Sequence, residues 1–418
     1  MKSMRRIING VVCGAILATV TSCSSNVPEA VELSKDQVAC SRENNAADSK
    51  YPEFSWDHIP KYMHLWKQTA FTEEELKHLA EYPLITFEKA QGIRDEASVQ
   101  EGTLKAAAAV KAVNPKVKVL YYKNVIIDWF SGMSPELEKI DGGYLRNTEG
   151  EYPSLGGQKR KYFDISLPEV QDWWMKDATR MLSDPNIDGI FIDANIKVWV
   201  TPYFAKWNKM GEEKTRKIQE GYHQLMTRLN EEHRQDKIIF ANILRARFEK
   251  GGLEFMDYFD GSYLENFEKN VEGVSRPDYI AKGIACAQKA ARDGRIIALT
   301  MGMGKAMDDS SGMGFDEVRS RIEDLESISN RLDYVTAIFL IIAEKYSYFH
   351  PHDGYGVYLD GKGRQRNRLW MKELPVFEKR LGPPKGPASK NGYIYTREFE
   401  YCSVWLDIEN EKARLEWR

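Results

Sequence analysis

The chain of 418 residues has few of the features that mark several common classes of protein. Its 59 Lys and Arg residues are balanced by 62 Asp and Glu residues, a net charge of −3, so we expect no nucleic-acid partner. No Gly-x-Ser-x-Gly motif occurs, which disfavours an esterase. The segment Gly302-Met303-Gly304-Lys305 lacks the spacing and the hydroxyl residue of a phosphate-binding loop.

Metal-binding patterns are also sparse. Of the five cysteines, Cys40, Cys286 and Cys402 lie far apart along the part expected to fold, and they follow no metal-ligand spacing. We treat them as structural, with one disulfide possible in an oxidising compartment. The segment His350-Pro351-His352-Asp353 holds two histidines but no clear third ligand. We therefore expect neither a metal nor another cofactor.

The N-terminal segment has the order of a secretion signal. Basic residues precede an apolar run over residues 7–20, and Val20-Thr21-Ser22-Cys23 follows. The run is short for a membrane-spanning helix, and the whole resembles a bacterial lipoprotein signal. We predict that residues 1–22 are removed, that Cys23 is lipidated and that residues 23–50 form a tether. The membrane is then a partner through the lipid. Ser24 favours the outer membrane, on its periplasmic or cell-surface side.

Short apolar runs alternate with helical patterns from residue 82 onward. Such alternation is typical of a parallel sheet, and eight units over about 270 residues match a (β/α)8 TIM barrel, assigned to residues 51–380. A doubly wound open sheet is the alternative, but no glycine-rich fingerprint follows the first strand. We expect helices over residues 98–113, 134–140, 167–183, 211–234, 251–257, 276–293 and 315–345. The predicted strands are 82–88, 116–123, 161–165, 188–193, 237–242, 259–265, 295–300 and 345–350.

Two segments flank these repeats. Residues 51–81 look like a lead-in, with a capping-box pattern at Thr72-Glu73-Glu74-Glu75. The turn-rich stretch 382–387 interrupts the pattern near the other end. Two β-like runs over residues 392–399 and 401–406 then predict a hairpin, so that 381–418 is a C-terminal β segment packed on the barrel.

Two of the predicted strands that end in a carboxylate stand out. These are residues 188–193, which end in Asp193, and residues 259–265, which end in Glu265. Active sites of barrels form at the C-terminal ends of the strands, and glycoside hydrolysis uses two carboxylates. We predict Asp193 as nucleophile, or as base in an inverting enzyme. Glu265 has apolar neighbours, which favour a protonated acid that later acts as base. The alternatives are a helix cap for Asp193 and a surface salt bridge with Lys269 for Glu265.

Other polar and aromatic side chains lie at or near the predicted rim. Amides and carboxylates can bind sugar hydroxyls, and aromatic rings can stack on apolar sugar faces, although capping, ion pairing and core packing explain such residues equally well. Trp129, Trp199 and Tyr348 are the candidate sugar platforms. The candidate substrate-binding residues are Glu88, Asn124, Asp128, Asp164, Asn195, Trp199, Asn242, Tyr263 and His350.

Several segments together resemble a known group of proteins. They are TFEKAQG (86–92), YFDIS (162–166) with a Trp-rich helix after it, DGIFIDAN (188–195), Glu265, and the tail LGPPKGPASKNGYIYTREFE (381–400). The chain is similar, over roughly residues 80–408, to hypothetical barrel glycoside hydrolases found as lipoproteins in Bacteroidetes-like bacteria. The resemblance implies a nucleophile at the end of strand four and an acid/base at the end of strand six, which are the positions of Asp193 and Glu265. Beyond residue 400 the match is loose.

The sequence thus predicts a lipid-anchored glycoside hydrolase that acts on a polysaccharide or oligosaccharide. A non-catalytic carbohydrate-binding lipoprotein on the same scaffold is the alternative, because a fold does not imply a function. A polysaccharide lyase or a metal-dependent deacetylase is a third possibility. Whether Asp193 and Glu265 face one cleft at catalytic distance separates the first two hypotheses.

Overall fold

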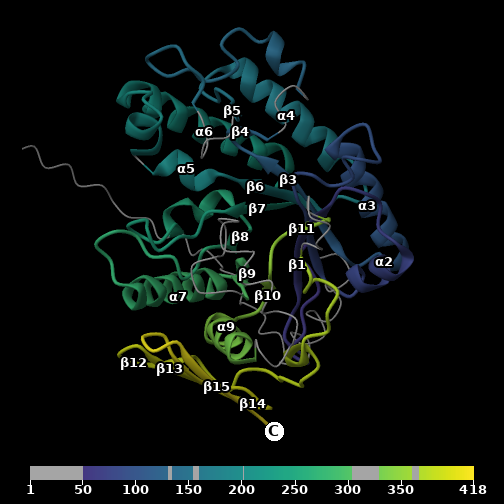
Figure 1. The fold of residues 1–418 in the computed structure, drawn as a ribbon, viewed down its shortest axis with the longest axis vertical. Coiled ribbons are helices and arrows are strands. Elements are labelled where there is room, and N and C mark those ends of the chain that lie inside the picture. The colour runs from purple at the N-terminus through teal and green to yellow at the C-terminus, as the bar shows by residue number, and fades with distance from the viewer. Residues whose placement is uncertain (1–49, 130–133, 154–159, 201, 304–328, 360–366) are drawn as a thin grey trace, which may run out of the picture. The chain divides into compact units, whose positions relative to one another are not determined.

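A curled parallel sheet is the central element of the computed structural model, which describes residues 50–129, 134–153, 160–200, 202–303, 329–359 and 367–418 (Figure 1). Its strand order is β10-β9-β8-β7-β6-β3-β2-β1-β11, and all pairs are parallel. The predicted signal peptide, Cys23, Cys40 and all but the last residue of the predicted tether lie outside the described residues. The strands are β1 Tyr62–Lys67, β2 Leu84–Phe87, β3 Lys118–Asn124, β6 Gly189–Asp193, β7 Ile238–Asn242, β8 Gly261–Leu264, β9 Ile296–Gly302, β10 Ser347–His352 and β11 Gly356–Val357.

The sheet closes on itself along β1. At the start of β1, Lys61 forms a parallel bridge with Phe349 of β10, and the Phe349 amide donates to the Pro60 carbonyl at 2.8 Å. At the end of β1, Trp66 and Lys67 pair with β11. The predicted (β/α)8 TIM barrel is therefore confirmed. Strands β10 and β11 together occupy its last position and close it against β1.

One predicted barrel strand is wrong and one was missed. Residues 161–165 contribute only β5, Lys161–Tyr162, which pairs antiparallel with β4, Ile127–Asp128, outside the barrel. The true first strand is β1, in the segment read as a lead-in, where the polar His64 interrupts the apolar run. Because the missed strand and the wrong one both precede residue 188, β6 and β8 are still the fourth and sixth strands.

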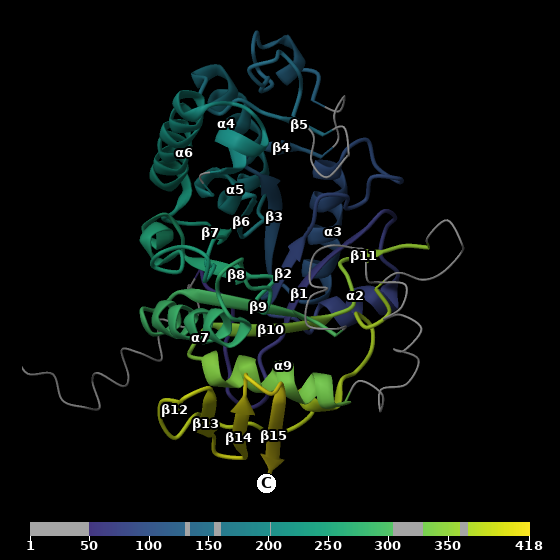
Figure 2. The same ribbon diagram turned by 60° about the vertical axis from the view of Figure 1, so that its left-hand side comes forward.

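Most predicted helices are present, and they cover the outside of the barrel (Figures 1 and 2). The capping box at Thr72 and Glu75 is formed. The helix that begins at Pro168 has Leu167 as its N-cap, with no side-chain hydrogen bond, although Ser166 directly precedes Leu167 and resembles a capping residue in the sequence. Part of the helix predicted over 315–345 lies outside the described residues. The helices are α2 Glu73–Leu79, α3 Val99–Val113, η1 Leu137–Lys139, α4 Pro168–Leu182, α5 Asn195–Trp199, η2 Tyr203–Trp207, α6 Glu212–His233, η3 Leu253–Tyr258, α7 Arg276–Arg292, α9 Ser329–Ile342 and η5 Pro375–Phe377.

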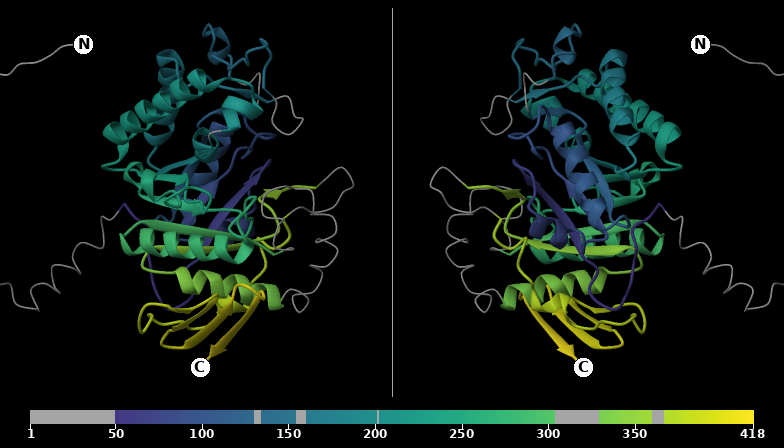
Figure 3. Two further views of the ribbon diagram at one scale, coloured as in Figure 1. Left: turned by 90° about the vertical axis from the view of Figure 1, so that its left-hand side faces the viewer. Right: turned by 90° about the vertical axis from the view of Figure 1, so that its right-hand side faces the viewer.

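The C-terminal segment is a four-stranded antiparallel sheet rather than the single predicted hairpin. The predicted runs correspond to β13 and β14, and one further strand pairs on each side. The sheet packs against α9, on the other side of the barrel from α4 and α6 (Figures 2 and 3). Its strands are β12 Ser389–Asn391, β13 Ile394–Glu398, β14 Cys402–Asp407 and β15 Lys412–Trp417.

Two apolar cores hold the barrel. One fills the interior and includes Phe191, Phe240 and Tyr263, while the larger one lies between the strands and the surrounding helices. Cys286 and Cys402 are free thiols, one partly buried and one buried. Among the helices of the described ranges, none combines the length and apolar character needed to cross a bilayer.

Candidate active site

Three neighbouring strands bring their terminal polar residues together at the C-terminal rim. Asp193 ends β6, Asn242 ends β7, and Glu265 follows β8 directly. The strands pair in the order β6-β7-β8, so Asn242 stands between the two carboxylates. The sequence pattern alone placed all three residues at this rim.

The Asn242 amide bridges the two carboxylates. Its Nδ2 donates to Asp193 Oδ1 at 3.2 Å and to Glu265 Oε2 at 3.1 Å. One amide nitrogen carries two hydrogens, so it can serve both acceptors at once. These two oxygens are therefore no more than 6.3 Å apart, the sum of the two distances. Asp193 and Glu265 face one another across a single side chain.

Asp193 also accepts a short hydrogen bond from Tyr122. The Tyr122 hydroxyl lies 2.6 Å from Asp193 Oδ2, and it accepts from the Trp129 indole at 3.0 Å and from the Asn124 amide at 3.2 Å. Burial, and then the Asp193 charge, raise the pKa of Tyr122 well above 10. The hydroxyl therefore stays protonated and remains a donor to Asp193. Two donors from neighbouring strands thus fix one carboxylate.

Glu265 has an ionic partner rather than the apolar surroundings expected from its neighbours in sequence. Arg245 Nη2 lies 3.2 Å from Glu265 Oε2, and the two side chains are 8% and 20% exposed. Arg245 also donates to the Leu244 carbonyl at 3.2 Å. The expectation failed because Arg245 comes from the loop after β7, twenty residues away in sequence. The pair lies at the rim beside the Asn242 bridge.

The residue after each carboxylate has a left-handed backbone. Ala194 has φ 67° and Asn266 has φ 53°. Asn tolerates this conformation, but for Ala it costs on the order of 1 kcal/mol. Ala194, not Asp193, is the N-cap of α5, so the helix-cap alternative for Asp193 does not hold. Both turns redirect the chain directly after the carboxylate.

A second charged group lies at the end of β2. Glu88 is buried and forms an ion pair with the Lys89 ammonium, and its Oε1 lies 3.8 Å from His64 Nε2. Burial alone would raise the pKa of Glu88, but the Lys89 charge and then His64 lower it to about 2. Lys89 Nζ also lies 5.3 Å from the centre of the Tyr122 ring and 5.2 Å from that of Trp129. Glu88 is thus connected to the surroundings of Asp193 through Lys89.

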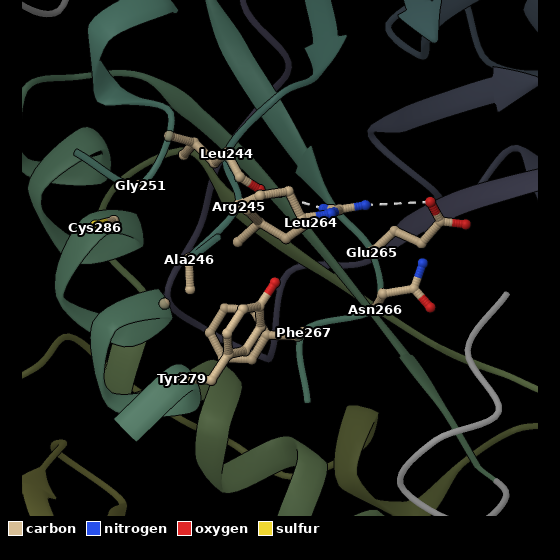
Figure 4. A pocket seen from close by; sticks show the side chains of 11 residues that line it. Leu244, Arg245, Ala246, Gly251, Leu264, Glu265, Asn266, Phe267, Tyr279 and Cys286 are labelled. Carbon is tan, nitrogen blue, oxygen red and sulfur yellow. Dashed lines mark hydrogen bonds and ion pairs between the residues drawn. The ribbon is translucent and has the colours of Figure 1, made fainter. Parts of the chain in front are cut away.

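A pocket opens beside Glu265 (Figure 4). Its empty space of about 280 Å³ includes open solvent, and its walls come from the loop after β7, the end of β8 and helix α7. Phe267 and Tyr279 form its aromatic side, and Cys286 lies against Gly251. Asp193 does not line this pocket. The hollow thus reaches only the Glu265 side of the bridged pair.

Five predicted substrate-binding residues have contacts within the protein. Four of them bond to backbone groups or neighbouring side chains, whereas Trp199 stacks on Phe255 with ring centres 4.9 Å apart and its buried indole Nε1 has no hydrogen-bond partner among the described residues. The contacts are Asn124 Oδ1 with the amides of Ile126 and Ile127, Asp128 with the Tyr144 hydroxyl, Asp164 with Ser166 and Lys214, and Asn195 with the Ile192 carbonyl and Tyr222.

Tyr263 and His350 lie inside the barrel. The Tyr263 hydroxyl donates to Tyr355 at 2.7 Å, and its ring lies 4.9 Å from that of His64. His350 Nδ1 accepts from the His64 amide at 3.0 Å. Burial, and then His352, lower the pKa of His350 well below its usual value, so the ring is neutral. Tyr348, a candidate platform, is also buried here and bonds to the carbonyls of residues 52 and 53.

Sequence reasoning missed several contributors to this region. Tyr122 and Lys89 directly neighbour predicted strand ends, whereas Arg245 lies in a loop and His64 in a strand that was not recognised. Inward alternation along β3 is a signal that marks Tyr122, two residues before Asn124. Nothing in the sequence pairs Arg245 with Glu265. Among the described residues, no group of His, Cys, Asp and Glu has a metal-binding arrangement.

A parallel barrel with acidic side chains on its rim is an architecture that many enzyme families share. The chain belongs to the family described as hypothetical glycosyl hydrolase family 15, whose model matches residues 111–403. This agrees with the predicted class of glycoside hydrolase. No curated protein matches the chain.

Solved structures of glycoside hydrolases resemble the chain at low identity. The glycoside hydrolase domain of PelA from Pseudomonas aeruginosa is 12% identical, with a TM-score of 0.41 over 62% of this chain and 91% of that chain. The maltogenic alpha-amylase AmyB from Thermotoga neapolitana is 10% identical, with a TM-score of 0.45 over 85% and 86%. The GH31 dextranase FjDex31A from Flavobacterium johnsoniae is 12% identical, with a TM-score of 0.45 over 72% and 37%. None of these likenesses bears on the chemistry of the site.

Proposed function

We propose that the protein is a glycoside hydrolase that cleaves a polysaccharide or oligosaccharide between Asp193 and Glu265. The observation that carries the proposal is the Asn242 amide, which holds one carboxylate on each side at the C-terminal rim. Membership of a glycosyl hydrolase family supports it. Two carboxylates that flank a glycosidic bond supply all the acid, base and nucleophilic chemistry that the reaction needs.

The proposed reaction proceeds with retention. Glu265 gives its proton to the glycosidic oxygen as the bond to the anomeric carbon breaks, and Asp193 forms an ester with that carbon. Water then attacks the anomeric carbon and loses a proton to Glu265, and the bond between that carbon and the Asp193 oxygen breaks, which frees the carboxylate. Retaining pairs stand roughly 5–5.5 Å apart and inverting pairs about 6.5–9.5 Å. The limit of 6.3 Å on the bridged oxygens supports the shorter class.

Product release from a panel of polysaccharides and oligosaccharides tests this proposal. Asp193→Asn and Glu265→Gln should each abolish products while leaving the circular dichroism spectrum unchanged. Asp188→Asn is the matched control, because Asp188 precedes β6 at the opposite end of the barrel and pairs with Lys111. Equal losses in Asp188→Asn and Asp193→Asn, or full activity of Asp193→Asn, would overturn the assignment.

One observation favours a second function, carbohydrate binding without catalysis. The Arg245 guanidinium on Glu265 stabilises the carboxylate in its charged form, which is unsuited to donating a proton. For catalysis, Glu265 has to take up a proton beside this cation. If no glycan is cleaved but one binds, and binding survives Glu265→Gln, the binding protein is the better account.

The membrane attachment predicted at Cys23 is part of the proposal. A processed chain that begins at Cys23 and carries acyl groups is expected in the outer membrane fraction. Mass spectrometry of the purified N-terminal peptide measures this directly. A Cys23→Ser chain should then fail to acquire lipid, whereas an unmodified Cys23 peptide from wild type would contradict the anchor.

A further inference from the structure

Two aromatic side chains stand out on the surface. Trp207 is 63% exposed and Tyr152 is 41% exposed, and within the described ranges no other aromatic residue belongs to the exposed class. Apolar ring surface left in water forgoes the free energy that its burial would provide. Neither ring takes part in the chemistry proposed for Asp193 and Glu265.

The two segments that carry these rings are joined to each other. The Thr148 amide donates to the Lys209 carbonyl at 3.0 Å. Lys209 Nζ contacts both carboxylate oxygens of Glu149, at 2.8 and 2.9 Å. Trp207 lies two residues before Lys209, and Tyr152 lies three residues after Glu149. The exposed rings therefore belong to one surface, although 55 residues separate them in sequence.

A second ring supports each exposed one. Tyr144 packs edge-on against Tyr152 with ring centres 6.4 Å apart, and Tyr203 packs against Trp207 at 6.1 Å. We call these four residues the aromatic ridge. The supporting hydroxyls are anchored, because Tyr144 donates to Asp128 at 2.7 Å and Tyr203 lies 2.5 Å from the hydroxyl of Tyr162.

The ridge is linked to the carboxylate pair by hydrogen bonds and by the chain itself. Its anchors, Asp128 and Tyr162, belong to the paired strands β4 and β5. The next residue, Trp129, donates to the Tyr122 hydroxyl, which in turn donates to Asp193. Trp207 also lies in the connection from β6 to α6, after the strand that ends in Asp193. The hydrogen bonds through Tyr122 and Trp129, and the chain that follows β6, thus both connect Asp193 with the exposed rings.

The backbone at Trp207 is unusual. Residues 203–207 form one turn of π-helix, closed by a bond of 3.0 Å from the Asn208 amide to the Tyr203 carbonyl. Lys209 then has φ 53°. Such π turns are rare and are frequent at functional sites. The turn ends at Trp207, so the unusual backbone and the exposed ring coincide.

The chemistry around the rings fits a sugar chain. Arg146 lies 4.0 Å from the centre of the Tyr152 ring, Lys161 lies 4.4 Å from Tyr144, and Lys197 lies 5.5 Å from Tyr203. Aromatic faces bind the apolar faces of sugars, and the cations can donate hydrogen bonds to sugar hydroxyls. A protein-docking face is typically a broad, contiguous apolar patch, whereas here charged groups separate the rings.

We propose that the aromatic ridge is a distal glycan-binding surface, which holds sugar units of a polymeric chain at a distance from the units at Asp193 and Glu265. The proposal rests on the proposed function and narrows its substrate to glycans long enough to reach from the carboxylate pair to Trp207. The ridge contributes binding and takes no part in bond cleavage.

The first experiment measures binding without requiring cleavage. The full-length protein is run in native gels that contain dextran, pullulan, xylan, laminarin or partly deacetylated poly-N-acetylglucosamine. At least one polymer should retard the wild type. Trp207→Ala should weaken that retardation about tenfold in apparent Kd, as expected for one lost aromatic contact. Tyr152→Ala with Trp207→Ala should remove it, and Trp207→Phe should retain most of it.

Trp405→Ala is the matched control, because Trp405 is a partly exposed tryptophan on the C-terminal sheet. Equal retardation of the wild type and the double variant, or no retardation in any of the five gels, overturns the proposal. A change in oligomeric state of Trp207→Ala by sedimentation, with binding unchanged, identifies a protein interface instead and also overturns it.

The second experiment separates the ridge from the catalytic proposal. On any polymer that the wild type cleaves, Trp207→Ala should lower kcat/KM about tenfold, but less than twofold on a di- or trisaccharide of the same linkage. Equal losses on long and short substrates contradict a distal surface. If the wild type cleaves nothing, the catalytic proposal fails, and the gel experiment alone decides on the ridge.

Discussion

The buried carboxylate of Glu88 gives the most quantitative prediction. The Lys89 charge and His64 lower its pKa from 4.5 to about 2 despite burial. The difference between these two pKa values corresponds to about 3 kcal/mol of folding free energy. Because the pKa in the folded state is depressed, this stability is present above pH 4.5 and is lost as the pH falls towards 2. By pH 3 about 1 kcal/mol of it should remain.

Urea unfolding of the wild type and of Glu88→Gln at pH 7 and pH 3 measures the contribution of the Glu88 carboxylate to the free energy of unfolding. The difference in unfolding free energy should be about 3 kcal/mol at pH 7 and about 1 kcal/mol at pH 3. Glu81→Gln is the control, because Glu81 is 56% exposed and its pair with Lys61 is worth at most about 1 kcal/mol. A cost of Glu88→Gln that is negligible at pH 7, or that is the same at both pH values, would refute the reasoning.

Two further predictions concern the site and the core beneath it. Asn242→Ala removes the bridge between Asp193 and Glu265 and should lower kcat about a hundredfold with little change in KM, because misplaced catalytic groups reduce the rate rather than the affinity. Asn230→Ala on α6 is the control. Steady-state kinetics that show only a raised KM would make Asn242 a substrate-binding residue instead. Phe191→Ala leaves a cavity at the centre of the barrel interior and should lower the free energy of unfolding, measured with denaturant, by about 3–5 kcal/mol. A loss below about 1 kcal/mol would contradict the packing described.

The sequence predicts the barrel well because the spacing of apolar residues and the lengths of the apolar and helical segments distinguish strands from helices. Buried parallel strands such as β6 read as continuous apolar runs, and α6 and α7 fall within one residue of their predicted ends. The first strand escaped because His64 faces the barrel interior, where its neighbours are aromatic rings. Residues 161–165 were misread because buried aromatic side chains in the β4–β5 excursion imitate a barrel strand.

The candidate site also has residues that the sequence predicts and residues that it does not. Asp193, Asn242 and Glu265 are local to strand ends, so the rule that barrel sites form at the C-terminal rim locates them. Partners are not local, and no sequence rule links Arg245 to Glu265 or Tyr122 to Asp193. Trp199 and Trp207 look alike in sequence. Packing against Phe255 partly buries Trp199, and only the structure shows that Trp207 is exposed.

Azide rescue is the most direct test of the roles given to Asp193 and Glu265. Asp193→Ala and Glu265→Ala are each incubated with azide and an activated glycoside of a sugar that the wild type releases, and the products are identified by NMR. A retaining mechanism predicts a glycosyl azide of inverted configuration from Asp193→Ala, and one of retained configuration from Glu265→Ala. Wild-type rates in either variant without azide, or rescue of neither variant, would contradict the assignment of this pair.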